Sequence, residues 1–288
     1  MEQLSFSVPP EWDGRQVKEV VRRALGFSAR TLTQLKQTHG GILRNGAPVR
    51  AVDRLFSGDV LTLSPPGEQG TCPPVFTPLK IVYEDGHFLV VDKPANMPVH
   101  PSPGHDLDSL CNAVAGYYEQ TGQQRLARPL YRLDRDTSGL IVFAKHRPAA
   151  GARVEKRYFA VCEGLLSGFG TIDVPIGLAP QSKIKRVCGT GERAVTHWRS
   201  ICTGERHSFL ELTLETGRTH QIRAHLSWLG HPIAGDDLYG GSREMIGRQA
   251  LFCGKLHLSC PALQVEQSLA CALSEDLYAA FPWIKYRK

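Results

Sequence analysis

Apolar residues near the N-terminus recur with the period of a helix. Val17, Val20, Val21, Ala24 and Leu25 follow the spacing i, i+3, i+4, i+7 and i+8. Residues with this spacing share one face of an α-helix. The pattern therefore predicts an amphipathic helix that packs one face on a small core.

A second helix and two short strands are predicted to follow. Ser28 suits the N-cap of a helix in which Leu32 and Leu35 face inward. The segment "ILRNGAPV" predicts a short strand, with Asn45 and Gly46 forming a turn of the hairpin type. "SGDVLTL" predicts another turn and another strand.

Strand patterns dominate the remainder of the chain. "KIVYEDGHFLVVDKP" predicts two strands around an Asp85-Gly86 turn. The segment "GLIVFA" is apolar enough to be buried on both faces of a sheet. Further strands are predicted at 139–144, 157–162, 194–201 and 209–215.

Three helices interrupt these strands. One is predicted over 109–120, and a last one begins near Ser274. Between them, "RTHQIRAHLSWLG" predicts a helix with Thr219 near its cap and Gly230 as its stop. Together these elements predict an α+β fold with a mixed, mostly antiparallel sheet and a central cleft.

A proline-rich stretch divides the chain. "SPPGEQGTCPPVFTP", residues 64–78, holds five prolines and two glycines in fifteen residues, which cannot continue a helix or a central strand. It is interpreted as a semi-extended linker. We therefore expect a small N-terminal α/β module over 1–66, a linker over 67–78 and a main domain over 79–288.

Composition describes an ordinary globular protein. Hydrophobic residues make up 42% of the 288 residues and charged residues 22%. No signal peptide or membrane-spanning stretch is predicted. None of the eight cysteines forms a C-x-x-C pair, so they are interpreted as reduced core residues. These features predict a cytoplasmic protein, and we expect a monomer.

The charge leans toward polyanionic partners. The net charge is +6, and residues 1–66 hold nine Lys or Arg against six Asp or Glu, a net of +3. Four of these basic residues fall outside the apolar stripes of the two predicted helices: Arg22, Arg23, Arg30 and Lys36. A solvated surface alone could explain the charge, and RNA binding could equally explain it.

The segment "RPLYRLDRDTSGLIVFAKH" concentrates charge at the start of a buried strand. Asp134 lies between Arg132 and Arg135. One interpretation is a structural ion pair beside a turn at 136–139. The other is a functional carboxylate, because a partly desolvated aspartate paired with arginine stays ionised and can act as a nucleophile or a base.

Several other chemistries find little support. The chain lacks the glycine-rich motifs of nucleotide-binding loops and the G-x-S-x-G elbow. His220, His225 and His231 do not align as metal ligands on one helix face, so no metal site is predicted. Asp134 and Asp136 would make a poor glycosidase pair, since flanking arginines oppose the raised pKa that such an acid needs.

Four segments resemble one enzyme family. "RLDRDTSGLIVFAK", "TGRTHQIRAHLSWLGHPIAGDDLYG", "VVDKPANMPVHP" and "VEKRYFAVCEG" look like the signature segments of RluA-type pseudouridine synthases. The resemblance covers residues 79–283. The N-terminal segment resembles the small RNA-binding domain first seen in a small-subunit ribosomal protein, the S-four type. The family isomerises uridine to pseudouridine within RNA.

The resemblance implies roles for three residues. Asp134 would be the catalytic aspartate, attacking carbon 6 of the uracil or carbon 1 of the ribose, or deprotonating the sugar. Tyr158 would stack on the flipped base or relay a proton. Arg223 would pair with Asp134. The reaction is a redox-neutral isomerisation, so no cofactor is expected.

Further residues are expected at the RNA. Arg132 would hold the flipped nucleotide or fill its place. The other substrate-binding candidates of the main domain are Arg135, Arg218, Thr219 and His220. Two features depart from the family. Tyr131 stands where histidine is common, and the stretch from His146 to Arg157 is shorter than the usual helix-bearing connection.

Two functions thus remain open at the level of sequence. The first is a pseudouridine synthase that modifies a specific uridine in structured RNA, with ribosomal RNA favoured over transfer RNA. The alternative is a non-catalytic RNA-binding ribosome-assembly factor built on the same scaffold.

Overall fold

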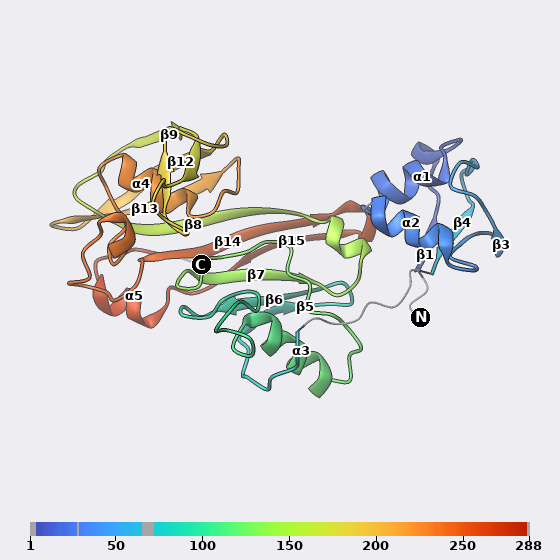
Figure 1. Cartoon of the computed structure of the whole chain (residues 1–288), viewed down its shortest axis with the longest axis horizontal. Helices are drawn as coiled ribbons and strands as arrows, with labels where there is room; N and C mark the ends of the chain where they lie inside the picture. Colours follow the sequence, from blue (N-terminus) through green and yellow to red (C-terminus); the bar gives the residue numbers. More distant parts are fainter. Residues whose placement is uncertain (1–3, 28, 65–71, 287–288) are drawn as a thin grey trace.

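The computed structural model describes residues 4–27, 29–64 and 72–286. A small module, residues 4–64, lies at one end of the molecule beside a larger body built on one extended sheet (Figure 1). Each part has its own hydrophobic core. No helix among these residues is long and apolar enough to cross a membrane.

The N-terminal module packs short helices on a four-stranded antiparallel sheet. Its helical segments are η1 (Pro10–Trp12), α1 (Val17–Glu19), η2 (Val20–Ala24) and α2 (Ala29–Gln37). Its strands are β1 (Leu4–Ser7), β2 (Ile42–Arg44), β3 (Ala47–Pro48) and β4 (Val60–Leu63), in the order β1-β4-β2-β3.

The predicted local structure of this module is confirmed. The first helix buries Val17, Val20 and Val21, and its second half is a π-helix. Asn45 and Gly46 both have positive φ, at 52° and 82°, as a two-residue hairpin turn of type I′ requires. The proposed cap at Ser28 lies outside the described residues.

The main body is a nine-stranded sheet in the order β5-β6-β7-β14-β8-β13-β12-β9, with β15 paired to β14. The strands are β5 (Ile81–Glu84), β6 (Phe88–Lys93), β7 (Ser138–Ala144), β8 (Arg153–Glu163), β9 (Phe169–Asp173), β12 (Val195–Thr203), β13 (His207–Leu214), β14 (Leu251–Cys260) and β15 (Val265–Ala270). Only β7 and β14 run parallel within the described sheet, so the predicted mixed, mostly antiparallel sheet is confirmed.

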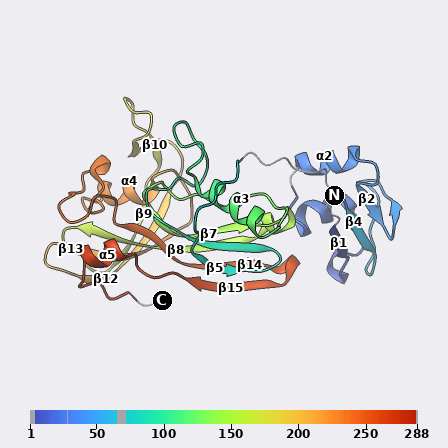
Figure 2. The same ribbon diagram turned by 90° about the horizontal axis from the view of Figure 1, so that it is seen from below.

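Helices and a hairpin complete the body. These are α3 (Leu110–Gln120), α4 (Gln221–Trp228), α5 (Glu275–Ala280), the turns η3 (Pro148–Gly151), η4 (Asp237–Tyr239) and η5 (Pro261–Leu263), and the hairpin of β10 (Ile176–Leu178) with β11 (Arg186–Cys188). The segment around β10 projects away from the sheet (Figure 2). All three predicted helices are present, and Thr219 directly precedes His220, the N-cap residue of α4.

The end of the linker is fixed against the main body. Val75 N–H donates to the carbonyl of Asn112 at 3.0 Å, and Asn112 Nδ2 donates to the carbonyl of Pro73 at 2.8 Å. Asn112 also completes the capping box of α3 with Ser109. Residues 73–75 therefore belong to the packed body, although the sequence predicts a semi-extended linker there.

The short connection between β7 and β8 forms η3. At this turn Gly151 lies against Gly26 of the N-terminal module, so closely that a Cβ on Gly26 would lie 3.0 Å from the Cα of Gly151. The two parts of the molecule thus meet backbone to backbone at a pair of glycines.

Gly139 and Ser138 are the residues of β7 in register with β14. The φ of Gly139 is +112°, and a Cβ there would lie 2.3 Å from the carbonyl oxygen of Cys253. We expect Gly139→Ala to lower the free energy of unfolding by about 3 kcal/mol or more, because it combines backbone strain with a backbone clash. Urea unfolding followed by circular dichroism measures this. Gly86→Ala is the control, since a Cβ there meets nothing within 4 Å. Equal losses in both variants would contradict the prediction.

Candidate active site

Asp134 lies in the loop that leads into β7, and hydrogen bonds hold this loop in place. Its carbonyl accepts from Thr137 N at 3.1 Å, which closes a turn. The ammonium of Lys93 donates to the carbonyls of Arg135, Pro94 and Met97 at 2.8–2.9 Å. Lys93 is fully buried, and burial lowers its pKa to about 7. One lysine thus ties the loop of Asp134 to the segment that follows β6.

Arg223 on α4 links Asp134 to a second carboxylate. Its Nη1 lies 3.1 Å from Oδ2 of Asp134, while Nε and Nη2 donate to both oxygens of Asp236 at 2.7 and 2.8 Å. Burial disfavours the charged guanidinium, but the bonds and charges of Asp236 and Asp134 raise the pKa of Arg223 overall. Arg223 is 7% exposed and Asp236 2%. The pairing of Arg223 with Asp134 that the sequence suggested is therefore present in the geometry.

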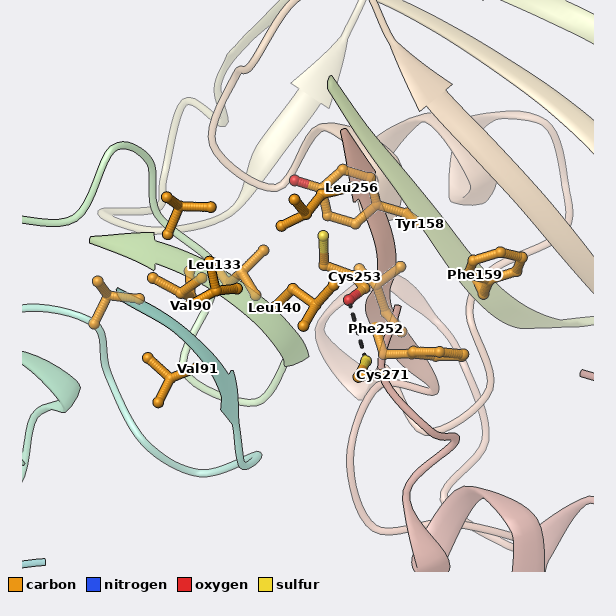
Figure 3. Close-up of a cluster of buried hydrophobic side chains, with 14 of the residues drawn as sticks. Val90, Val91, Leu133, Leu140, Tyr158, Phe159, Phe252, Cys253, Leu256 and Cys271 are labelled. Atoms are coloured by element: carbon orange, nitrogen blue, oxygen red, sulfur yellow. Dashed lines mark hydrogen bonds between the residues drawn. The ribbon is translucent and has the colours of Figure 1, made fainter. Parts of the chain in front are cut away.

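Tyr158 stands on β8 beside these groups. Figure 3 shows Tyr158 and Phe159 projecting to opposite sides of the strand, with Cys253 and Leu256 beside the tyrosine. Burial raises the pKa of Tyr158 well above its ordinary value, and the nearby charge of Asp134 adds to this. The phenol is thus neutral and lies in a largely apolar setting close to the carboxylate.

Tyr131, which stands where the resembled family often has histidine, has a structural attachment of its own. Its hydroxyl donates to the carbonyl of Leu140 on β7 at 2.8 Å. The ammonium of Lys156 lies 4.5 Å from the centre of its ring, a cation–π contact. The aromatic ring and the lysine together fill the space beside β7 and β8.

The other arginines of the Asp134 loop do not contact the carboxylate. Arg135 is exposed and pairs with Asp136, with Nε 3.1 Å from Oδ1. Arg132 is exposed at the surface of the loop. Both side chains therefore remain accessible to a polyanion at the surface.

The predicted residues before α4 differ in their surroundings. Arg218 donates to Glu192 at 2.9 Å and to the carbonyl of Arg193 at 3.1 Å, so it joins α4 to the segment after β11. Thr219 is exposed. His220 turns toward the carboxylate, with Nε2 3.8 Å from Oδ2 of Asp134.

Two residues of this site escaped the sequence analysis. Asp236 supplies the buried partner of Arg223. The ring of Tyr239 lies 5.0 Å from the Arg223 guanidinium, and its hydroxyl is 3.0 Å from His220 Nδ1. Both belong to "GDDLYG", where an acidic pair follows the apolar "PIAG". A buried carboxylate needs a cationic partner, so an acidic pair directly after an apolar segment was the signal by which Asp236 could have been found.

The basic residues of the N-terminal module lie in the other part of the molecule. Arg22 and Arg23 on η2 and Lys36 on α2 are exposed. Arg30 also falls within α2, but its side chain lies outside the described part of the chain. Throughout the described residues, no group of three or more His, Cys, Asp or Glu side chains could hold a metal ion.

Comparisons with known proteins identify one family. Residues 87–228 match the family model described as RNA pseudouridylate synthase. The chain is 41% identical over 267 residues to the RNA pseudouridine synthase YjbO of Bacillus subtilis, covering 88% of this chain and 94% of that protein. It is 34% identical over 308 residues to the ribosomal large subunit pseudouridine synthase D of Pseudomonas aeruginosa, covering 99% and 95%.

A solved structure shows the same architecture. The human RNA pseudouridylate synthase domain containing 1 superposes with a TM-score of 0.58 at 27% identity, covering 69% of this chain and 85% of that one. The two bacterial relatives are aligned over 88% and 99% of this chain. The chain therefore belongs to the RluA-type family of RNA pseudouridine synthases, isomerases that convert uridine in RNA to pseudouridine.

Proposed function

We propose that this enzyme converts a specific uridine of ribosomal RNA to pseudouridine, with Asp134 as its nucleophile. The observation that carries the proposal is the contact of Asp134 with Arg223, which is itself fixed by the buried Asp236. The side chain of Asp134 keeps 27% of its surface exposed, so a substrate can reach the carboxylate. The name of the Pseudomonas aeruginosa relative refers to the ribosomal large subunit, and this supports ribosomal RNA over transfer RNA as the proposed substrate.

The surroundings of Asp134 suit the chemistry. Isomerisation breaks the bond between N1 and C1′, forms a bond between C5 and C1′, and moves a proton from C5 to N1. The target uridine must leave its stack, at a cost of a few kcal/mol, before the carboxylate can reach it. In our proposal Tyr158 stacks on the flipped base and relays a proton, and Arg132 holds the flipped nucleotide or fills its place in the RNA. Arg135, Arg218, Thr219 and His220 line the approach.

The N-terminal module is proposed to anchor the RNA. In this division residues 1–66 form a small RNA-binding domain, 67–78 a linker and 79–288 the catalytic domain. Arg22, Arg23 and Lys36 present positive charge at the surface of the helices, and Arg30 of α2 is proposed to bind RNA with them. The β10–β11 hairpin adds Lys185, whose ammonium lies 5.7 Å from the centre of the Tyr239 ring. We expect the enzyme to act as a monomer in the cytoplasm.

Neutralising two basic residues of the module should weaken RNA binding in a salt-dependent way. We expect Arg22→Gln with Arg23→Gln to reduce the slope of log K against log salt by about 1 to 2, since each phosphate contact releases condensed counterions. Filter binding between low and moderate salt measures the slope. Arg50→Gln is the matched control, because Arg50 already pairs with Asp53. If Arg50→Gln changes the slope as strongly as the Arg22 and Arg23 double variant, this helix face is not a specific RNA-binding surface.

The test of the proposed function is tritium release from RNA that carries 5-tritiated uridine. The native chain is incubated separately with ribosomal RNA, with transfer RNA transcripts and with partly assembled large subunits. We expect release from ribosomal RNA or the particle, because the proton at C5 is lost. Release from transfer RNA alone would overturn the assigned target. Tight binding without release on any substrate would replace the enzyme with the assembly-factor alternative.

A further inference from the structure

A chain of hydrogen bonds runs from the β11 strand to the catalytic site through Tyr239. The backbone N–H of Arg186 donates to Tyr239 Oη at 2.8 Å, and the same oxygen lies 3.0 Å from His220 Nδ1. Tyr239 is 5% exposed, and burial raises the pKa of Tyr239, so the hydroxyl keeps its proton. Because an amide N–H can only donate, the hydroxyl accepts from Arg186 and has its own proton available for His220.

This arrangement determines the tautomer of His220. If Nδ1 accepts the hydroxyl proton of Tyr239, the hydrogen of the neutral imidazole must lie on Nε2. The reverse assignment would leave the buried hydroxyl proton without an acceptor among the described residues. Nε2–H then faces Asp134, at 3.8 Å from Oδ2.

The charges around His220 favour its neutral form. Burial lowers the pKa of His220 and Arg223 adds to this, while Asp134 and Asp236 oppose it. The groups that face the imidazole come from four segments, namely Asp134 before β7, Arg223 on α4, Asp236 and Tyr239 at η4, and Lys185 and Arg186 at β11. A neutral donor beside Asp134 orients a carboxylate without adding a further positive charge.

The backbone of His220 also indicates that its side chain serves the site. The residue adopts the left-handed conformation, with φ 57° and ψ 21°, which is uncommon outside glycine. It is the N-cap of α4, yet its side chain makes no capping hydrogen bond to the helix. A Ser, Asp or Asn at this position would satisfy the helix end better. The imidazole hydrogen-bonds to Tyr239 and not to the first turn of α4.

We propose that His220 is a positioning residue for Asp134: Tyr239 holds it as the Nε2–H tautomer, and this N–H fixes the carboxylate when uridine enters. The inference rests on the proposed function. In the absence of RNA the distance of 3.8 Å exceeds a hydrogen bond, and a rotation of the Asp134 side chain closes it. The role differs from the RNA contact that the sequence suggested for His220.

The tautomer can be read without any activity. In protein labelled with 15N-histidine, the chemical shifts of His220, assigned with the His220→Asn variant, should show protonated Nε2 and unprotonated Nδ1 at pH 7.5. The same spectrum of Tyr239→Phe should show a mixture of tautomers and a raised pKa, because the hydrogen bond that stabilised the neutral ring is gone. A native Nδ1–H tautomer would overturn the proposal even if the enzyme is fully active.

Kinetics then separate positioning from a structural role. Single-turnover tritium release is measured between pH 5 and 9 for the native chain and three variants. Tyr239→Phe should lower the rate constant about tenfold at saturating RNA. It should also move the acidic limb of the profile to higher pH. Protonated His220 forms an ion pair with Asp134, and this makes the carboxylate less nucleophilic.

Two substitutions of His220 are matched to each other. Gln can place an amide N–H near the position of Nε2, while Asn tolerates the left-handed backbone but its amide reaches only as far as Nδ1. We expect His220→Asn to lower the rate constant about 100-fold and His220→Gln to lower it only about tenfold. Neither variant should show an acidic limb from residue 220. Equal rates for both, or an unmoved profile in Tyr239→Phe, would refute the assignment. Absence of release by the native chain refutes the proposed function instead.

Discussion

Replacing Asp134 with asparagine is expected to abolish tritium release, with a loss of about 10⁴-fold or more in the rate of the chemical step. The change keeps the size of the side chain and can keep one contact with Arg223, but it removes the nucleophilic oxygen. RNA affinity and the melting temperature should stay close to those of the native chain. Rapid-quench tritium release, filter binding and thermal unfolding measure the three quantities.

Asp136→Asn is the control for charge. Asp136 lies two residues further along the same loop and pairs with the exposed Arg135, so its loss should change the rate by only a few fold. Comparable inactivation of both variants would mean that the loop needs its charge and not a nucleophile at Asp134. Retained turnover in Asp134→Asn would remove Asp134 from the chemistry.

Replacing Asp236 with asparagine is expected to cost both stability and activity. Arg223 would keep its buried charge but lose the bidentate carboxylate that compensates it. Breaking a buried ion pair from one side typically costs about 3 kcal/mol or more in the free energy of unfolding. The released guanidinium should also misplace Asp134, lowering turnover about 100-fold. Urea unfolding and tritium release measure the two losses.

A double variant distinguishes the two effects. Arg223→Met combined with Asp236→Leu replaces the buried pair by apolar side chains of similar size, which often restores stability. We expect this protein to unfold at nearly the native urea concentration and still to be inactive, because Asp134 has lost its cation. Recovery of turnover together with stability would show that Arg223 serves only the fold.

The sequence predicted most of the sheet but omitted its centre. Runs of alternating or continuous apolar residues were sufficient to place β5 to β8, β12 and β13, because each of these strands keeps its pattern over its length. β14 lies between β7 and β8, yet it was not among the predicted strands. Gly254 interrupts its pattern at a shift in register between Cys253 and Lys255. A glycine inside a strand indicates a bulge only once the neighbouring strands are known.

The sequence predicted those residues of the candidate site that lie within the segments resembling the family. Asp134, Tyr158 and Arg223 came from the resemblance, and the structure brings them together. The bidentate contact of Asp236 and the hydrogen bond of Tyr239 could not be inferred, because only the folded path of the chain after α4 brings these residues back to that helix. Likewise, Thr219 and His220 are both polar, and only the backbone torsion shows which of them caps the helix.

The position of β14 has a consequence for how the chain is synthesised. β7 and β8 are synthesised well before β14, and each keeps an open edge until β14 has been made. Because long-range pairing is slow, the nascent chain carries unpaired apolar edges while α4 and η4 are made. We therefore expect premature release before Leu251 to give an aggregating product. The enzyme can therefore begin to modify RNA only after Leu251–Cys260 have been synthesised.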